Sequence, residues 1–243
     1  MLGQPRKKQE TMQKQSFSLS FLILAIVSAV SLIVSNILAV KQFDIHLFGV
    51  NFTSTAGLLI FPISYIINDC ISEVWGYRKA RFIIWISFTC NFLVIGLFQL
   101  SVVLPPAAHW TSMQPAYESV LAQTPRIALA SLLAFLGGSF INAFIMSRMK
   151  VRHQGKYFAR RAIVSTLWGE LADTFLFTTL GFFGVIPTKV VFVIILTETV
   201  LKTCYEIIIL PITMRVVKYI KSHENTDTYD REISYNPFKI GQI

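Results

Sequence analysis

The sequence has 243 residues, of which only 14% are charged, whereas about 25% are charged in a typical soluble domain. Hydrophobic residues make up 53% of the chain and include 20 Phe, so the charges are too few to cover the surface of a water-soluble fold. This composition excludes a disordered chain, a coiled coil and a disulfide scaffold, and it favours a protein that faces lipid. The net charge of +9 does not indicate nucleic acid as a partner, because the charges lie between apolar runs.

Apolar runs long enough to cross a hydrocarbon core of roughly 30 Å as helices follow one another along the chain. They cover residues 17–40, 53–74, 82–104, 126–147, 162–186 and 190–214. The first run is too long for a cleaved signal peptide, so we expect it to be retained. Pro105 and Pro106 end the third run, and the short link between the last two runs predicts an antiparallel helical hairpin.

The distribution of Lys and Arg predicts how these spans are oriented. The N-terminal segment, the second and fourth connections and the C-terminal tail hold 18 of the 22 basic residues, and the opposite connections hold three. Because cytoplasmic connections carry the excess of basic residues, both termini are expected in the cytoplasm. The sequence therefore predicts an all-α integral membrane protein, with a bundle of six transmembrane helices over residues 17–220. A polar segment, 1–16, precedes the bundle, and a polar and poorly ordered tail, 221–243, follows it.

Ionisable residues inside the predicted spans are the most unusual feature of the sequence. They are Asp69 and Glu73 in the second span, Glu170 and Asp173 in the fifth, and Glu198, Lys202 and Glu206 in the sixth. Each charge deep in a membrane costs about 2.5 to 3.5 kcal/mol, so these residues need protonation, ion pairing or a hydrated cavity. Such residues typically mark a substrate or ion pathway.

The spacing of these residues groups them on helix faces. Glu198, Lys202 and Glu206 are spaced i, i+4, i+8, so Lys202 can contact both carboxylates. The acids of the second and fifth spans are also one turn apart, and we expect the three polar stripes to face one central cavity. A structural ion-pair ladder that locks the bundle is the alternative. Asn36 and Asn142 are weaker candidates, because interhelical hydrogen bonds explain them equally well.

Three motifs resemble those of the queuosine precursor transporter family. They are NDCISEVWGYRKAR at the end of the second span, RRAIVSTLWGELADT entering the fifth, and the Lys202 and Glu206 pair followed by Pro211 in the sixth. Members of this family are small six-helix inner-membrane proteins of bacteria that import the 7-deazaguanines preQ0 and preQ1 and, in some members, queuine. The resemblance implies that the protein lies in a lipid bilayer and that its substrate is a small molecule. The chain has no nucleotide-binding loop of the GxxxxGK type, so we expect it to act alone.

The resemblance also implies roles for the polar residues. One carboxylate can accept hydrogen bonds from the ring N–H and the amino group of a guanine-like edge, and an Asn or Lys side chain can donate to its carbonyl. The residues expected to bind substrate are Asn36, Asn68, Asp69, Glu170, Asp173, Glu198, Lys202 and Glu206. Glu73 and Arg81 are expected to form a cytoplasmic gate. No catalytic residue, cofactor or metal is expected, because the three cysteines and four histidines show no ligand spacing.

The sequence therefore predicts a secondary importer of queuosine precursors for tRNA queuosine salvage, either proton-coupled or facilitative. Alternatives are an importer of queuine or another nucleobase-like molecule, an intramembrane enzyme that uses paired carboxylates, and a scaffold or sensor that transports nothing. No nucleophile arrangement or metal-binding His pair supports the enzyme. A homodimer is a further hypothesis.

Overall fold

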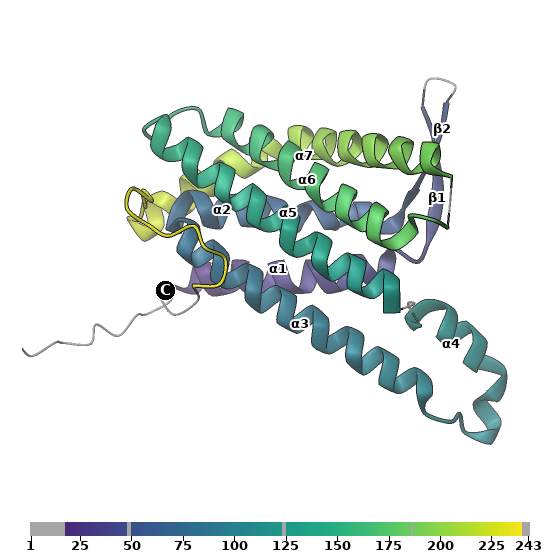
Figure 1. The fold of residues 1–243 in the computed structure, drawn as a ribbon. Helices are drawn as coiled ribbons and strands as arrows, with labels where there is room; N and C mark the ends of the chain where they lie inside the picture. Colours follow the sequence, from purple (N-terminus) through teal and green to yellow (C-terminus); the bar gives the residue numbers. More distant parts are fainter. Residues whose placement is uncertain (1–17, 48–49, 123–124, 186, 240–243) are drawn as a thin grey trace, which may run out of the picture.

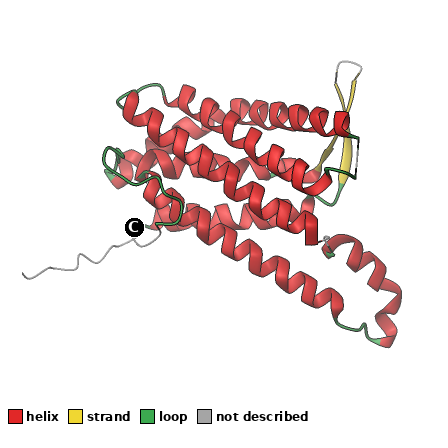
Figure 2. Cartoon of the chain, in the orientation of Figure 1, coloured by secondary structure: helices red, strands yellow, loops and turns green. Residues whose placement is uncertain are grey.

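The computed structural model describes residues 18–47, 50–122, 125–185 and 187–239. Its elements, in chain order, are α1 (Leu19–Leu38), β1 (Gln42–Leu47), β2 (Val50–Thr55), the short 3-10 helix η1 (Ala56–Leu59), α2 (Phe61–Trp75), α3 (Tyr77–Val103), the 3-10 helix η2 (Ala108–Met113), α4 (Gln114–Leu121), α5 (Pro125–Arg152), α6 (Phe158–Phe182) and α7 (Thr188–Glu224). The long helices run side by side and form a bundle (Figures 1 and 2). The protein is an all-α membrane protein in its main architecture, as the sequence predicts.

Within the described chain, four helical stretches are long and apolar enough to cross a membrane, judged by length and composition. They are 19–38, 56–75, 77–103 and 108–152. The helices α6 and α7 are 25 and 37 residues long. They carry the acidic residues and Lys202 of the fifth and sixth predicted spans.

A β-hairpin between α1 and α2 is the element that the sequence-based prediction missed. β1 and β2 pair antiparallel, with Gln42 opposite Thr55 and Leu47 opposite Val50. Residues Phe43, Ile45 and Leu47 alternate with polar residues, which is the period of a strand rather than that of a helix. The expectation of a purely helical chain is therefore wrong at this connection.

The connections gather at two opposite ends of the bundle (Figure 1). The β-hairpin, α4 and the link between α6 and α7 lie at one end, which we call the hairpin end. The turn between α2 and α3, the link between α5 and α6 and residues 225–239 lie at the other, which we call the tail end. The basic residues of the second and fourth predicted connections thus lie at the tail end.

Two glycines allow α5 and α6 to approach closely. A Cβ atom on Gly138 would lie 2.7 Å from Asp173 Cβ and 2.8 Å from the Gly169 carbonyl oxygen. A Cβ atom on Gly169 would lie 2.8 Å from Asn142 Cβ and 3.0 Å from Tyr65 Cε1. Since no larger residue fits at either position, these glycines let the polar face of α6 meet α2 and α5.

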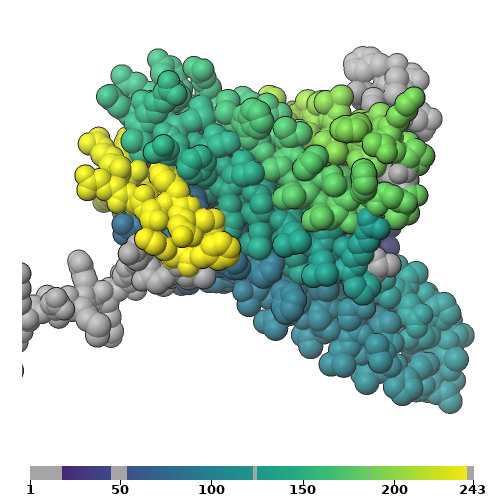
Figure 3. All heavy atoms as spheres, viewed as in Figure 1, coloured from purple at the N-terminus to yellow at the C-terminus, as the bar shows by residue number. Residues whose placement is uncertain are grey.

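Residues 226–239, which follow α7, are packed against the helices, whereas the sequence predicts a poorly ordered tail over 221–243. Tyr77 N–H and the Ser147 hydroxyl donate to Asp230 Oδ2 at 2.8 and 2.6 Å, and Trp85 Nε1 donates to the Pro237 carbonyl at 2.9 Å. Residues 226–238 therefore lie across the ends of α2, α3 and α5, and the space-filling view shows them in yellow on the tail end (Figure 3). Polar composition is a poor guide here, because buried partners on the bundle supply the contacts.

Candidate functional site

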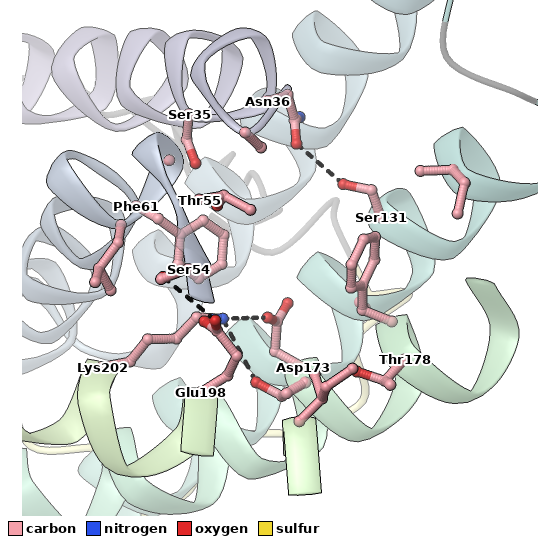
Figure 4. A pocket seen from close by; sticks show the side chains of 18 of the residues that line it. Ser35, Asn36, Ser54, Thr55, Phe61, Ser131, Asp173, Thr178, Glu198 and Lys202 are labelled. Carbon is pink, nitrogen blue, oxygen red and sulfur yellow. Dashed lines mark hydrogen bonds and ion pairs between the residues drawn. The ribbon is translucent and has the colours of Figure 1, made fainter. Parts of the chain in front are cut away.

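A cavity of about 640 Å³ lies near the hairpin end of the bundle (Figure 4). Its wall is built by residues from α1, β2, α2, α5, α6 and α7. The wall combines aromatic side chains with hydroxyl, amide, carboxyl and ammonium groups: Phe61, Phe135, Phe177, Ser35, Asn36, Ser54, Thr55, Ser131, Asp173, Thr174, Glu198 and Lys202 are among its residues. A small planar molecule with polar edges fits this combination of surfaces.

Lys202 on α7 organises the polar part of the cavity. Its Nζ lies 3.3 Å from Glu170 Oε2 and 3.3 Å from Asp173 Oδ2, and it also lies 4.3 Å from the centre of the Phe61 ring. The side chain of Lys202 is 12% exposed, compared with 1% for Glu170. The ammonium group therefore separates the cavity from the most deeply buried acid of α6.

Glu198, one turn before Lys202, presents a second carboxylate to the cavity. The Ser54 hydroxyl donates to Glu198 Oε1 at 3.3 Å, and the Glu198 carboxylate lies close to the Lys202 ammonium group (Figure 4). One hydroxyl donor leaves this carboxylate capacity for further hydrogen bonds, because an ionised carboxylate accepts about four.

Asn36 is fixed in the opposite wall of the cavity by two hydrogen bonds. Its Nδ2 donates to Asn91 Oδ1 at 3.0 Å, and its Oδ1 accepts a hydrogen bond from the Ser131 hydroxyl at 3.1 Å. These bonds orient the amide, so Asn36 serves the packing of α1, α3 and α5 as well as the cavity wall (Figure 4).

A second polar group lies deeper in the bundle. Asn142 Nδ2 donates to Asp69 Oδ1 at 2.9 Å, and Asn68 Nδ2 donates to Asn142 Oδ1 at 2.7 Å. Glu206 on α7 faces Asp69 and lies beside Thr166. Asp69 and Asn142 are each 0% exposed, and Glu206 is 1% exposed. This group connects α2, α5, α6 and α7 away from the cavity.

A third group, at the tail end, is a network of ion pairs around Glu73. Arg161 Nη2 lies 2.5 Å from Glu73 Oε2, and Lys221 Nζ lies 2.6 Å from Glu73 Oε1. Asp227 lies 2.5 Å from Lys150 and 2.8 Å from Lys221. Because Glu73 is 1% exposed and both its oxygens are paired with cations, this network locks α2 to α6 and α7.

The structure thus separates the predicted site residues into groups. The cavity wall contains Asn36, Asp173, Glu198 and Lys202. Asn68, Asp69 and Glu206 lie in the deeper group, and Glu170 lies between the two, paired with Lys202. The residues expected around one cavity therefore lie partly in its wall and partly in a buried group outside it, and Lys202 forms its ion pairs with Glu170 and Asp173 on α6 rather than with Glu206.

Glu73 and Arg81, the pair expected to form a gate, do not contact each other. Arg81 Nη1 donates to the carbonyl oxygens of Ser234 and Asn236 at 3.2 and 2.8 Å, whereas Glu73 is paired with Arg161 and Lys221. Both residues lie at the tail end, and each ties that end together through a different partner.

The sequence alone does not indicate a role for Ser54, Phe61, Lys150 or Asp227. Ser54 belongs to the unexpected hairpin, and Phe61 is one of 20 Phe in the chain, so neither carries a signal of its own. Lys150 was counted only as a cytoplasmic charge. Its side chain is in fact 2% exposed, and no sequence spacing relates it to Asp227 because the two lie 77 residues apart.

Comparisons with known proteins agree with this architecture. Residues 55–216 match the family described as "Putative vitamin uptake transporter". The chain is 28% identical over 193 residues to the "Probable queuosine precursor transporter" of Bacillus subtilis (strain 168), which covers 79% of this chain and 82% of that protein. It is 27% identical over 133 residues to the "Probable queuosine precursor transporter" of Haemophilus influenzae, which covers 55% of this chain and 54% of that protein.

No solved structure matches the chain. The family match includes α2, α3, α5 and α6 and most of α7. It therefore includes Asp69, Asn142 and Glu206 of the deeper group, whereas Asn36 and Ser54 of the cavity wall and Lys221 and Asp227 of the tail-end network lie outside it. It supports the expectation that the protein is not an enzyme, because the family is one of transporters. The chain belongs to the family of membrane transporters described as vitamin uptake transporters.

Proposed function

We propose that this protein is a secondary transporter that imports queuosine precursors such as preQ0 and preQ1. The observation that carries the proposal is the cavity of about 640 Å³, in which carboxylates, an ammonium group and aromatic rings meet in the interior of an apolar bundle. The names of the two relatives supply the class of substrate. The chemistry of the cavity fits that class.

Glu198 and Asp173 are the carboxylates that we propose to read the base. A 7-deazaguanine presents a ring N–H beside an exocyclic amino group, and one carboxylate can accept from both. The adjacent ring carbonyl needs a donor, a role that suits Lys202. The Phe61 ring, which already contacts the Lys202 ammonium group, offers a face on which the bicyclic base can stack. Asn36 contributes to the site by stabilising the cavity wall through its hydrogen bonds, and Glu170 contributes by its ion pair with Lys202.

The proposed topology places six helices, α1, α2, α3, α5, α6 and α7, across the bacterial inner membrane, with both termini in the cytoplasm. The excess of Lys and Arg in the connections at the tail end supports this orientation. In this orientation the cavity lies toward the periplasm. The ion pairs of Glu73 close the cytoplasmic side, together with the tail residues to which Arg81 donates hydrogen bonds. The structure then corresponds to the state that receives substrate from outside, in an alternating-access cycle.

Uptake by the purified protein in liposomes tests this proposal. We expect time-dependent entry of labelled preQ1 that unlabelled preQ0 or preQ1 inhibits and that empty liposomes lack. Glu198→Gln is expected to abolish most of this uptake, because the amide replaces one of the two acceptor oxygens by an NH2 donor, which meets an N–H of the base edge. Glu118→Gln, an exposed acid on α4, is the matched control. Normal uptake by Glu198→Gln would contradict the assignment of Glu198, and a failure of the wild type to transport either compound would contradict the function.

A further inference from the structure

Asp69 and Glu206 form a buried pair that neither the cavity nor the ion pairs at the tail end explain. Asp69 on α2 is 0% exposed, and Glu206 on α7 is 1% exposed. Neither residue is part of the cavity wall. Their carboxyl groups face each other within hydrogen-bonding reach.

Most oxygens of this pair lack a hydrogen-bond donor among the described residues. Asp69 Oδ2 and both carboxyl oxygens of Glu206 are buried without one, although the Thr166 hydroxyl lies beside Glu206. Asp69 Oδ1 accepts from Asn142 at 2.9 Å and from the Ser165 hydroxyl at 3.5 Å. Two ionised carboxylates in contact repel each other, and burial adds the cost of removing both charges from water. A proton between them removes one charge and converts one carboxyl group into a donor for the other. The pair therefore has the composition of a site for one shared proton.

The groups around the pair do not neutralise it. The titratable groups that act on the pair are Cys70 and Glu73 on α2 and Glu170 on α6, while α5 contributes the neutral Asn142. The basic residues nearest in sequence to Glu170 on α6 and to Glu206 on α7 are Arg161 and Lys202. Both basic groups are engaged by other acids: Arg161 pairs with Glu73, and Lys202 pairs with Glu170 and Asp173. A proton is thus the simplest counter-charge for Asp69 and Glu206.

We propose that Asp69 and Glu206 bind the proton whose movement drives import, so that the transporter is a proton symporter. This inference rests on the proposed function. The pair lies between the two ends of the pathway: Glu170 connects it to Lys202 in the cavity, and Glu73, one turn after Asp69, connects it to the tail-end network.

The contacts of Lys202 provide the coupling between substrate and proton. A base that accepts a hydrogen bond from Lys202 draws the ammonium group away from Glu170. The negative charge of Glu170 then acts more strongly on Glu206, and the pair retains its proton while the substrate is bound. On the cytoplasmic side, loss of substrate lets Lys202 return to Glu170, and the pair releases the proton.

Accumulation of labelled preQ0 in liposomes tests this mechanism on the wild-type protein. PreQ0 has no titratable side-chain amine, so its charge does not change with pH in the neutral range. With the membrane potential clamped, one proton per substrate predicts about a tenfold accumulation for each unit of inward pH gradient. A pH-sensitive dye trapped inside should report acidification when preQ0 is added. Transport without accumulation or acidification, or accumulation that follows a sodium gradient, would overturn the inference.

The variants Asp69→Asn and Glu206→Gln test whether this pair binds the transported proton. Each variant is expected to lose accumulation and acidification, while it still binds preQ0 and exchanges it across the membrane without a gradient. Glu118→Gln is expected to behave like the wild type. Gradient-driven accumulation that persists in both variants would place the proton elsewhere and overturn the inference.

The same measurements separate failure of the mechanism from failure of the function. Wild-type protein that exchanges preQ0 but moves no protons contradicts only the symport mechanism. Wild-type protein that neither binds nor exchanges preQ0 contradicts the proposed function as well. Loss of preQ0 binding in both variants, with thermal denaturation equal to that of the wild type, would place the pair in the substrate site and overturn its role as a proton site.

Discussion

The two ends of the bundle use the same kinds of side chains in opposite ways. At the tail end, Glu73 is clamped between two cations at 2.5 and 2.6 Å and is fully paired. At the cavity, Lys202 is shared between two acids at 3.3 Å each and is partly exposed. Short, saturated ion pairs make a rigid closure, whereas a longer, shared ion pair can exchange a protein partner for a ligand. The difference in pairing, rather than in composition, distinguishes the tail end from the cavity.

Glu73→Gln is expected to have the largest effect on stability, because it leaves Arg161 and Lys221 without their shared carboxylate. Breaking a buried ion pair by removing one partner costs about 3 to 5 kcal/mol. The measurement is thermal denaturation of the purified protein in detergent, with Glu232→Gln, an exposed acid in the tail, as the control. Equal melting temperatures for Glu73→Gln and the wild type would show that the tail-end network does not stabilise the bundle.

Lys202→Met is expected to have the next largest effect, on substrate affinity. Removing one partner of a buried, hydrogen-bonded charge pair costs about 2 to 5 kcal/mol, or roughly thirtyfold or more in affinity. Binding of labelled preQ1 to the purified protein measures this loss. Lys189→Met, an exposed lysine at the start of α7, is the matched control. Unchanged affinity in Lys202→Met would exclude the ammonium group from the binding site.

The sequence predicted the helical class and the polar helices, because long apolar runs and buried charges leave strong one-dimensional signals. It did not predict which charges meet. Spacing places Lys202 beside Glu198 and Glu206 on its own helix, but in the structure its Nζ forms ion pairs with Glu170 and Asp173 on α6. Gly138 and Gly169 also let α5 and α6 pack tightly, which the sequence did not indicate. Partners across helices depend on rotation and packing, which short-range spacing does not encode.

Gly138→Ala tests this tight packing and is expected to cost about 1 to 3 kcal/mol through overpacking. The added methyl group would meet Asp173 Cβ at 2.7 Å, beside the ion pair with Lys202. Gly96→Ala is the control, because no atom lies within 4 Å of its added Cβ, and a helical Gly→Ala change is mildly stabilising. The melting temperature should therefore fall in Gly138→Ala and rise slightly in Gly96→Ala. Melting temperatures that change in the same direction in both variants would contradict the close contact between α5 and α6.

Asp227→Asn is expected to have the smallest effect, and its pH dependence is distinctive. Partial burial raises the pKa of Asp227, but hydrogen bonds from Lys150 and Lys221 outweigh this effect and hold the pKa below its ordinary value of 3.8. A carboxyl group with a depressed pKa stabilises the fold above its unfolded-state pKa and loses this contribution as the pH falls through the folded-state value. The difference in melting temperature between the wild type and Asp227→Asn should be constant near neutral pH and shrink below about pH 4. A difference that changes between pH 5 and 8 would contradict this pairing.

The most direct test of the account is the uptake of labelled preQ0 by the purified wild-type protein in liposomes under an inward pH gradient. The account predicts that preQ0 enters, accumulates above its external concentration and acidifies the interior as it does so. Liposomes with and without the protein that take up preQ0 equally would contradict the central claim.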